Sequence, residues 1–152
     1  MYIQPDSVIN AGDGVEWTDP AYCIDGNSET AAVATSVPGF VAKYLEFTFN
    51  TPKSFDGVKL SIGWGGTYGN FDAINLEYWN GSEWILLFHE GDTILGEKIV
   101  RSFERINGAT KFRINTGLSG DENEPESIYL NEIAFNTIPQ ACGFLVGGLL
   151  VR

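Results

Sequence analysis

The sequence predicts an all-β protein built as a single antiparallel β-sandwich. In several short segments, apolar and polar residues alternate with a period of two, which is typical of strands that lie on a core. Turn formers separate these segments at intervals of roughly ten residues, as in sandwiches rather than parallel sheets. The chain of 152 residues holds 18 glycines and only 19% charged residues, which suits one turn-rich domain.

The first forty residues contain turn clusters and short strand candidates. Val8 and Ile9 suit a short edge strand, and a cluster of turn formers follows them at residues 10–14. Residues 31–37 are small or β-branched, and a Pro-Gly pair ends this segment. Trp17 lies between the two segments and is expected to fill part of the core.

The middle of the chain carries the clearest strand patterns. Every second residue is apolar in residues 43–49, 58–62 and 74–78, so each segment is expected to form a half-buried strand. Asn80-Gly81 is the strongest hairpin signal in the chain. It leads into residues 84–88, whose continuous apolar character predicts a strand buried on both faces.

Residues 92–106 fit two structures. Their apolar spacing loosely allows a helix, but residues 99–103 also fit a strand, and we favour the strand. An Asn-Gly turn follows at residues 107–108. The last strands are expected at residues 110–114 and 128–135.

The net charge of −11 argues against several classes of function. Nucleic-acid binding needs a basic face that displaces counterions, whereas the nine Lys and Arg residues are spread along the chain. An anionic membrane would repel such a surface. Catalysis is not expected either, because the sequence has one histidine and neither a GxSxG nor an HExxH motif. Plain solubility, a bound cation or a basic protein partner would explain the acidic excess.

Two cysteines, Cys23 and Cys142, are too few for a disulfide framework in a chain of this length. Cys23 has apolar neighbours in the sequence, so free buried thiols are expected. Neither cysteine lies in a CxxC pair, so a zinc site is not expected.

The two ends of the sequence differ in character. The first residues lack the basic and apolar segments of a signal peptide, so synthesis in the cytosol is expected, and the chain would reach an outside surface only by another route. The apolar run from Gly143 to Val151 has nine residues, fewer than the roughly 20 that span a bilayer. We therefore divide the chain into a sandwich at residues 1–137 and an apolar tail at residues 138–152. The tail is expected to add a strand to its own sheet in cis or to a neighbouring chain in trans.

Several motifs follow one another in order between residues 15 and 136. They are an opening segment with Asp25-Gly26-Asn27 and Thr30, the strand at 43–49, the hairpin Trp79–Trp84, the strand Ala109–Ile114 and the closing segment Leu130–Phe135. This series resembles the discoidin family, also called the coagulation-factor C-type domain, which belongs to the galactose-binding-domain-like jelly rolls. The chain departs from the family at Ala32, where the family usually has tryptophan, and in its tail, which has no family counterpart.

The resemblance implies a structural calcium ion beside Asp25. The carboxylates of Asp25 and Glu132, the Thr30 hydroxyl and the carbonyl groups of the turn at Asn27 are hard oxygen donors of the kind calcium prefers. We expect Asp25 and Glu132 to meet there and to close the sandwich. The alternative is an Asp-Gly turn capped by Thr30, with Glu132 paired to a lysine or arginine.

Ligands of the resembled family bind at one end of the sandwich, on loops between strands. The matching loop candidates carry Trp64, Tyr68, Asn70 and His89. A sugar needs an aromatic face for its apolar side and polar groups for its hydroxyls, and these four residues offer both. The alternative is that both aromatic side chains fold back onto the core.

The ordered series of strand and turn motifs, together with the apolar tail, predicts a non-catalytic assembly protein. Residues 17–26 also resemble modules in phage structural proteins, so a phage-like virion component in a homo-oligomer is expected, such as a capsid-decoration, head–tail or tail protein. Its expected location is the virion, or alternatively the cytoplasm. The alternative function is a carbohydrate-binding module for host or surface glycans.

Overall fold

The computed structural model describes residues 1–36, 41–63, 70–93, 98–119, 126–139, 144–146 and 149–151. One 3-10 helix, η1 (Pro20–Ile24), lies between the second and third strands. Among the described residues, no helix is long and apolar enough to cross a membrane. The strands are β1 (Tyr2–Ile3), β2 (Ser7–Ala11), β3 (Ala32–Ser36), β4 (Tyr44–Ile62), β5 (Asn70–Trp79), β6 (Trp84–Thr93), β7 (Lys98–Ser119), β8 (Glu126–Ile138), β9 (Phe144–Val146) and β10 (Leu149–Val151).

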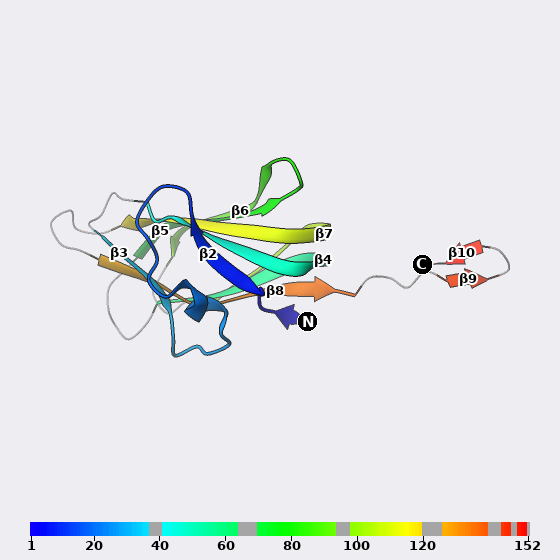
Figure 1. The fold of residues 1–152 in the computed structure, drawn as a ribbon, viewed down its shortest axis with the longest axis horizontal. Coiled ribbons are helices and arrows are strands. Elements are labelled where there is room, and N and C mark those ends of the chain that lie inside the picture. Colours follow the sequence, from blue (N-terminus) through cyan, green and yellow to red (C-terminus); the bar gives the residue numbers. More distant parts are fainter. Residues whose placement is uncertain are drawn as a thin grey trace.

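Two long strands, β4 and β7, bend and thereby contribute to both layers of the sandwich (Figure 1). The first part of β4 pairs with β2 on one side and with the last part of β7 on the other. The last part of β4 pairs with β8 and with the first part of β7. Between Thr48 and Gly57 the β4–β7 register shifts repeatedly, as expected where two strands turn together from one layer into the other.

Each layer therefore has a defined set of strands. One layer contains β2, the start of β4, the end of β7, β5 and β6. The other contains β1, β3, β8, the end of β4 and the start of β7. These strand pairs are all antiparallel, so the predicted all-β antiparallel sandwich is confirmed.

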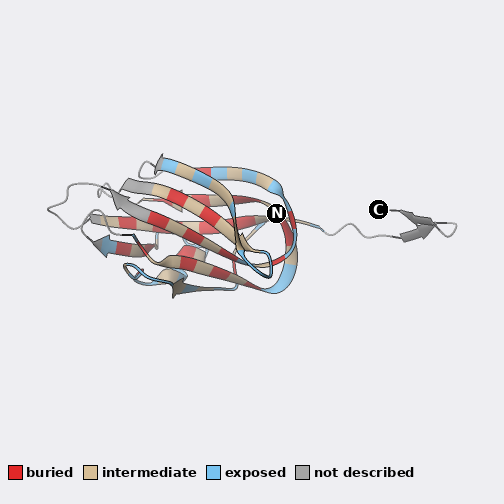
Figure 2. Ribbon diagram, turned by 90° about the horizontal axis from the view of Figure 1, so that it is seen from above, coloured by how far each residue is buried: buried red, intermediate tan, exposed pale blue. Residues whose placement is uncertain are grey.

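Phenylalanine rings fill the space between the layers. Phe49 and Phe55 flank the bend of β4, and their ring centroids are 4.7 Å apart. Phe112 of β7 and Phe135 of β8 complete the cluster at a centroid distance of 4.4 Å. Buried and partly exposed positions alternate along the strands (Figure 2), which confirms the predicted period of two in residues 43–49 and 58–62.

The predicted hairpin at Asn80-Gly81 is confirmed. The Asn80 side-chain oxygen accepts hydrogen bonds from the main-chain nitrogens of Ser82 and Glu83, at 2.8 and 2.9 Å. Gly81 has a φ of 105°, a conformation that a side chain would disfavour. The turn joins β5 and β6, with Trp79 and Trp84 opposite each other at its base.

The strand at residues 84–88 forms, but the prediction that it is buried on both faces is wrong. Among the described residues, β6 pairs only with β5 and is an edge strand of its layer. A register shift leaves Leu87 without an opposite residue on β5, and Leu86 is 56% exposed. An apolar run at a sheet edge gives the same sequence pattern as a central strand, because pairing partners are not visible in the sequence.

The strand favoured for residues 92–106 is confirmed from Lys98 onwards, because β7 begins there. Residues 94–97 lie outside the described residues. The predicted Asn-Gly turn at 107–108 coincides with the bend of β7, and Gly108 has a φ of 72°. This turn signal therefore marks a change of layer within one strand.

The start of the chain is tied to β8. The terminal amine of Met1 donates to the Asn136 side-chain oxygen at 2.9 Å, and the Thr137 main-chain nitrogen donates to the Met1 carbonyl at 2.8 Å. After β8, the tail strands β9 and β10 pair with each other in a separate two-stranded sheet. Figure 1 shows this hairpin apart from the sandwich.

We expect Phe112→Ala to lower the free energy of unfolding by about 3–5 kcal/mol, because the ring is fully buried among Phe49, Phe55 and Phe135. Urea denaturation followed by circular dichroism measures this change. The control is Val100→Ala, at a side chain that is 57% exposed. A loss no larger than that of the control would show that the phenylalanine cluster is not the core.

Candidate functional site

Four segments of the chain are flanked by strand residues that lie at the same end of the sandwich. They are residues 37–40, 64–69, 94–97 and 120–125, which all lie outside the described residues. The flanking strand residues are paired with one another: Asn70 with Ser119, Phe71 with Thr93, Ser61 with Lys98 and Ser36 with Glu126. The predicted ligand residues Trp64 and Tyr68 belong to one of these segments, so they lie outside the described residues.

The other two predicted ligand residues lie on β5 and β6. Asn70 is the first residue of β5, and His89 lies opposite Asn75 in the β5–β6 pair. Five residues of strand, roughly 16 Å, therefore separate Asn70 from the position of His89. His89 is exposed, and its Nδ1 lies 2.6 Å from the Asn75 side-chain oxygen. This contact orients the imidazole on the surface of the sheet and places it at a distance from Asn70.

Three predicted calcium ligands come together in the loop after η1. The Thr30 hydroxyl lies 2.7 Å from Asp25 Oδ2 and 2.8 Å from the Asn27 carbonyl oxygen. The Asn27 main-chain nitrogen donates to Asp25 Oδ1 at 2.8 Å, and the intervening Gly26 has a φ of 78°. The turn thus gathers a carboxylate, a hydroxyl and a carbonyl, and the Thr30 hydroxyl caps it as the alternative prediction states.

The fourth predicted ligand, Glu132, does not contact Asp25 directly. Its Oε1 accepts a hydrogen bond from the Gln4 side chain at 3.4 Å. The same Gln4 amide lies beside Gly26, where an added Cβ would be 3.4 Å from it. Gln4 therefore stands between the loop and β8, and the expected closure of the sandwich by Asp25 and Glu132 needs this correction. Gln4 thus hydrogen bonds to Glu132 on β8 and lies beside Gly26 of the loop.

A bulge in β8 brings the Asn131 side chain to this loop. Ser61 and Ile62 of β4 pair with Glu132 and Leu130, which leaves Asn131 between them without a partner on β4. The Asn131 amide donates to the Ser28 carbonyl at 3.3 Å, while its Oδ1 is buried without a hydrogen-bond partner in the described structure. A buried acceptor without a partner is unusual and calls for a donor or a cation.

These oxygens fit a hard cation in chemical type. Carboxylate, hydroxyl, carbonyl and amide oxygens are the donors that calcium takes. In the described part of the chain, however, no three side chains of His, Cys, Asp or Glu cluster as a metal site. The fit therefore rests on neutral oxygens around one or two carboxylates.

The outer face of the β4–β7–β5–β6 layer carries a stack that the sequence analysis did not identify. The Arg113 guanidinium lies over the rings of Tyr44 and Trp84, 3.9 and 4.4 Å from their centroids. Glu77 accepts from its Nε and Nη2 at 2.7 and 3.2 Å. These aromatic faces are occupied by the arginine, so this part of the sheet is not an open sugar platform. Opposite charges at paired strand positions were the signal available in the sequence.

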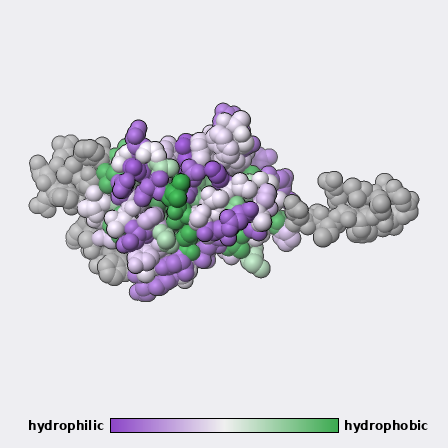
Figure 3. All heavy atoms as spheres, viewed as in Figure 1, coloured by the Kyte–Doolittle hydropathy of each residue, from purple (hydrophilic) through white to green (hydrophobic). Residues whose placement is uncertain are grey.

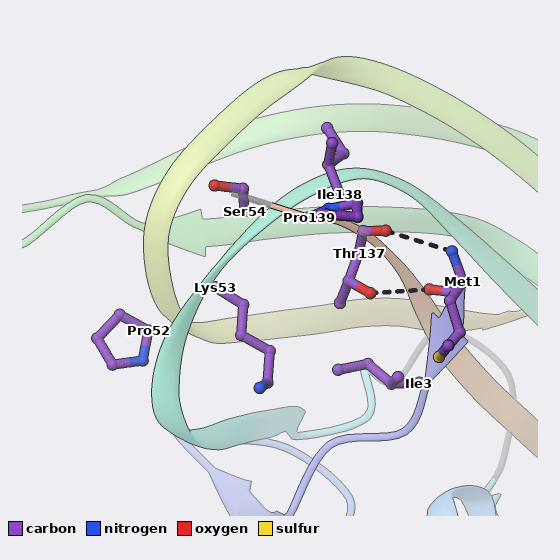
Figure 4. Close-up of a pocket in the computed structure, with 8 residues that line it drawn as sticks. All are labelled: Met1, Ile3, Pro52, Lys53, Ser54, Thr137, Ile138 and Pro139. Atoms are coloured by element: carbon purple, nitrogen blue, oxygen red, sulfur yellow. Dashed lines mark hydrogen bonds between the residues drawn. The ribbon is translucent and has the colours of Figure 1, made fainter. Parts of the chain in front are cut away.

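A groove of about 380 Å³ lies where the first and last strands of the sandwich meet (Figure 4). Ile3, Pro52 and Ile138 give it apolar walls. Figure 4 draws two of the hydrogen bonds between Met1 and Thr137 at its border, one of them from the Thr137 hydroxyl to the Met1 carbonyl at 3.0 Å. The groove lies beside the point where the tail leaves β8.

Two further hollows lie beside the β5–β6 hairpin, with volumes of about 470 and 320 Å³. Tyr78, Arg105 and Ile106 line both of them. Elsewhere the surface is mixed: Figure 3 shows a mostly hydrophilic face crossed by a narrow hydrophobic strip.

Known proteins resemble this chain in structure rather than in sequence. No family model matches the sequence, and no curated protein matches it. The CBM32 module of AlyQ, solved in complex with 4,5-unsaturated mannuronic acid, matches with a TM-score of 0.62 and 17% identity over 90% of this chain and 98% of that one. A pectin-binding carbohydrate-binding module matches with a TM-score of 0.61 and 18% identity over 91% and 94% of the two chains. Chitosan-binding module 1 of a chitosanase/glucanase from Paenibacillus sp. IK-5 matches with a TM-score of 0.60 and 15% identity over 88% and 96%.

These likenesses establish the fold. The chain has the galactose-binding-like jelly-roll fold of the CBM32 modules, which confirms the fold implied by the resemblance in the sequence. At identities of 17% and 18%, the fold does not transfer a ligand or a set of binding residues.

Cys23 is expected to be chemically inert in the folded protein. Burial raises the pKa of its thiol to about 12, and the thiol hydrogen bonds to the Pro20 carbonyl at 3.0 Å. At pH 8 only about one thiol in ten thousand would then be ionised. In a Cys142→Ser background, we expect a thiol reagent to react with Cys23 only after guanidinium is added. Rapid reaction in the native state would contradict the burial of this side chain.

Proposed function

We propose that this chain is a non-catalytic carbohydrate-binding module. The observation that carries the proposal is the fold. The structural matches to isolated sugar-binding modules cover nearly the whole of this chain and nearly the whole of each module. The chemistry of the described residues agrees with a binding role. The one histidine contacts Asn75, and the pKa of the Cys23 thiol is far above neutrality, so neither offers an activated nucleophile with an adjacent base.

The proposed sugar site lies at the end of the sandwich where the strand residues that flank these four segments lie. Trp64 and Tyr68 would supply the aromatic face, and Asn70 would supply an amide for the sugar hydroxyls. His89 lies too far along β6 to contact the same sugar ring as Asn70, so we assign it to a neighbouring unit of a longer glycan.

The charge of the chain favours a neutral or amino-sugar glycan over a polyuronate. The net charge is −11, and Lys43, Lys111, Arg101 and Arg113 are each paired with a glutamate. A polyuronate would bring further negative charge to this surface. The matched modules include a pectin-binding and a chitosan-binding protein, so the fold itself accepts glycans of either charge.

We also propose one structural calcium ion beside Asp25, Asn27 and Thr30. The buried Oδ1 of Asn131 supports this proposal, because a cation would give that oxygen a partner. Glu132 would join the site by exchanging its hydrogen bond with Gln4 for the ion. The ion would fasten the loop after η1 to β8.

The assembly role predicted from the tail remains a second candidate. Its supporting observation is that β9 and β10 pair only with each other in the described structure, although a two-stranded hairpin is marginally stable alone. The groove beside Ile3 and Ile138 lies near the start of the tail and would suit an apolar segment of a neighbouring copy. None of the structures named above is a virion protein.

Replacing either aromatic residue of the proposed sugar site should weaken binding. We expect Trp64→Ala and Tyr68→Ala each to lower glycan affinity roughly tenfold, which corresponds to about 1.4 kcal/mol. A glycan array followed by titration calorimetry measures this, with neutral and amino-sugar glycans expected to bind more tightly than pectin. Tyr2→Ala is the matched control, because Tyr2 is a partly exposed aromatic residue on β1. Failure of the native chain to bind any arrayed glycan would refute the proposed function.

Calcium should raise the melting temperature of the chain. The ion is expected to bind only the folded state. A calcium concentration one hundred times the dissociation constant would therefore raise the free energy of unfolding by about 2.7 kcal/mol. Asp25→Asn and Thr30→Val should remove this dependence, whereas Asp13→Asn, in an exposed turn, should retain it. Identical melting curves in excess chelator and in millimolar calcium would exclude the ion.

A further inference from the structure

The two hollows beside the β5–β6 hairpin form one cleft at an open edge of the sandwich. They share Tyr78, Arg105 and Ile106, and their volumes of about 470 and 320 Å³ fall within the range of roughly 300–1,000 Å³ that is common for small-molecule sites. Within the part of the chain that the structure describes, β6 pairs only with β5, and the facing part of β7, up to Ile106, pairs only with β4. The two layers are therefore not joined by strand pairing along this edge.

An ion pair closes the same edge farther from the hairpin. Arg101 of β7 donates to both carboxylate oxygens of Glu90 on β6, at 2.9 and 2.6 Å. These hydrogen bonds lower the pKa of Glu90, so the pair remains charged near neutral pH. The cleft occupies the part of the edge between this pair and the hairpin.

Apolar and aromatic side chains make up part of the cleft floor, while the exposed lining of the cleft as a whole is more polar than apolar. Tyr78, Leu87 and Phe103 are partly buried there, and Ile106 is 8% exposed. Leu86 lies at the rim with 56% of its surface exposed. Such a floor can hold the apolar face of a sugar ring.

One wall of the cleft presents an arginine that is held in place. Ser54, which is 2% exposed, donates to the Asn107 side-chain oxygen at 2.9 Å. The same oxygen accepts from Arg105 Nε at 2.9 Å. This leaves the two terminal nitrogens of Arg105 and the amide nitrogen of Asn107 without a hydrogen-bond partner in the described structure. A guanidinium fixed through its Nε offers a planar pair of donors at little cost in side-chain entropy.

We propose that this cleft is a second sugar-binding site, which takes a single neutral pyranose unit. The sugar would lie on the Tyr78 and Phe103 side chains, with two neighbouring hydroxyls accepting from the Arg105 nitrogens. A neutral sugar fits better than a uronate, because Glu104 lies beside Arg105 in the cleft and the whole chain carries a net charge of −11. This inference rests on the proposed sugar-binding function.

The two proposed sites lie at opposite ends of the sandwich. β5 runs from Asn70, at one end of the sandwich, to Trp79, beside the cleft, which is roughly 30 Å of strand. One domain with sites so placed would bind two glycan chains, or two parts of one chain, and would gain avidity from both contacts.

Titration followed by amide NMR shifts tests this inference with three probes: galactose, N-acetylglucosamine and glucuronic acid. With at least one neutral sugar, we expect two separate groups of shifting amides, one at residues 78–81 and 103–110 and one near Asn70, Thr93 and Ser119. Arg105→Ala should weaken the first group at least tenfold and leave the second unchanged. Arg105→Lys should also weaken it, since lysine lacks the planar fork, whereas the control Glu104→Gln should not.

The outcomes separate the two proposals. Shifts confined to the region of Asn70, Thr93 and Ser119 would overturn the second site and leave the proposed function standing. Shifts at the cleft that persist in both Arg105 variants would overturn the proposed binding mode. Shifts that are strongest with glucuronic acid would overturn the proposal of a neutral ligand. Absence of shifts with every probe would count against both proposals. Arg105 is exposed, and unchanged melting temperatures would show that its variants remain folded.

Discussion

The packing of phenylalanine rings across the bend in β4 and β7 is the interaction on which the two-layer structure depends. Phe49 precedes the bend and Phe55 follows it, so one strand supplies rings to the core from both layers. Phe112 and Phe135 meet them from β7 and β8. β4 and β7 bend together, so the burial of these rings fixes the two layers relative to each other. The positions of the surface residues follow from this arrangement of the layers.

The bend also divides the molecule into two ends with different properties. At one end, the strand residues that flank residues 37–40, 64–69, 94–97 and 120–125 lie next to one another. At the other end, the bend of β7 and the β5–β6 hairpin stand beside an unpaired edge, and a cleft opens between them. In this fold, the end that carries aromatic side chains and hydrogen-bond donors is therefore the end that can bind a ligand. In this chain we propose a sugar site at each end.

Sequence reasoning identified the turn that gathers Asp25, Asn27 and Thr30, because an Asp-Gly turn capped by a nearby threonine is a local structure. It did not identify Gln4, which contacts Glu132 from the far end of the chain, or the bulge that turns Asn131 toward Ser28. Nor did it identify Arg113 as the residue that covers two aromatic rings from different strands. Each of these contacts depends on register, which no single segment of sequence encodes.

The amino-acid sequence by itself determined the fold class, most strand positions, the Asn80-Gly81 hairpin and the acidic character of the surface. These follow from the period of side chains along a strand, the conformational freedom of glycine and the sum of charges, all of which are local or additive properties. Only the tertiary structure decided that β6 is an edge strand, that β4 and β7 cross between layers, and that Arg105 and Asn107 line a cleft with Tyr78 and Phe103. Those facts depend on which distant strands pair, and the free energy that selects the pairing comes from the burial of the whole core.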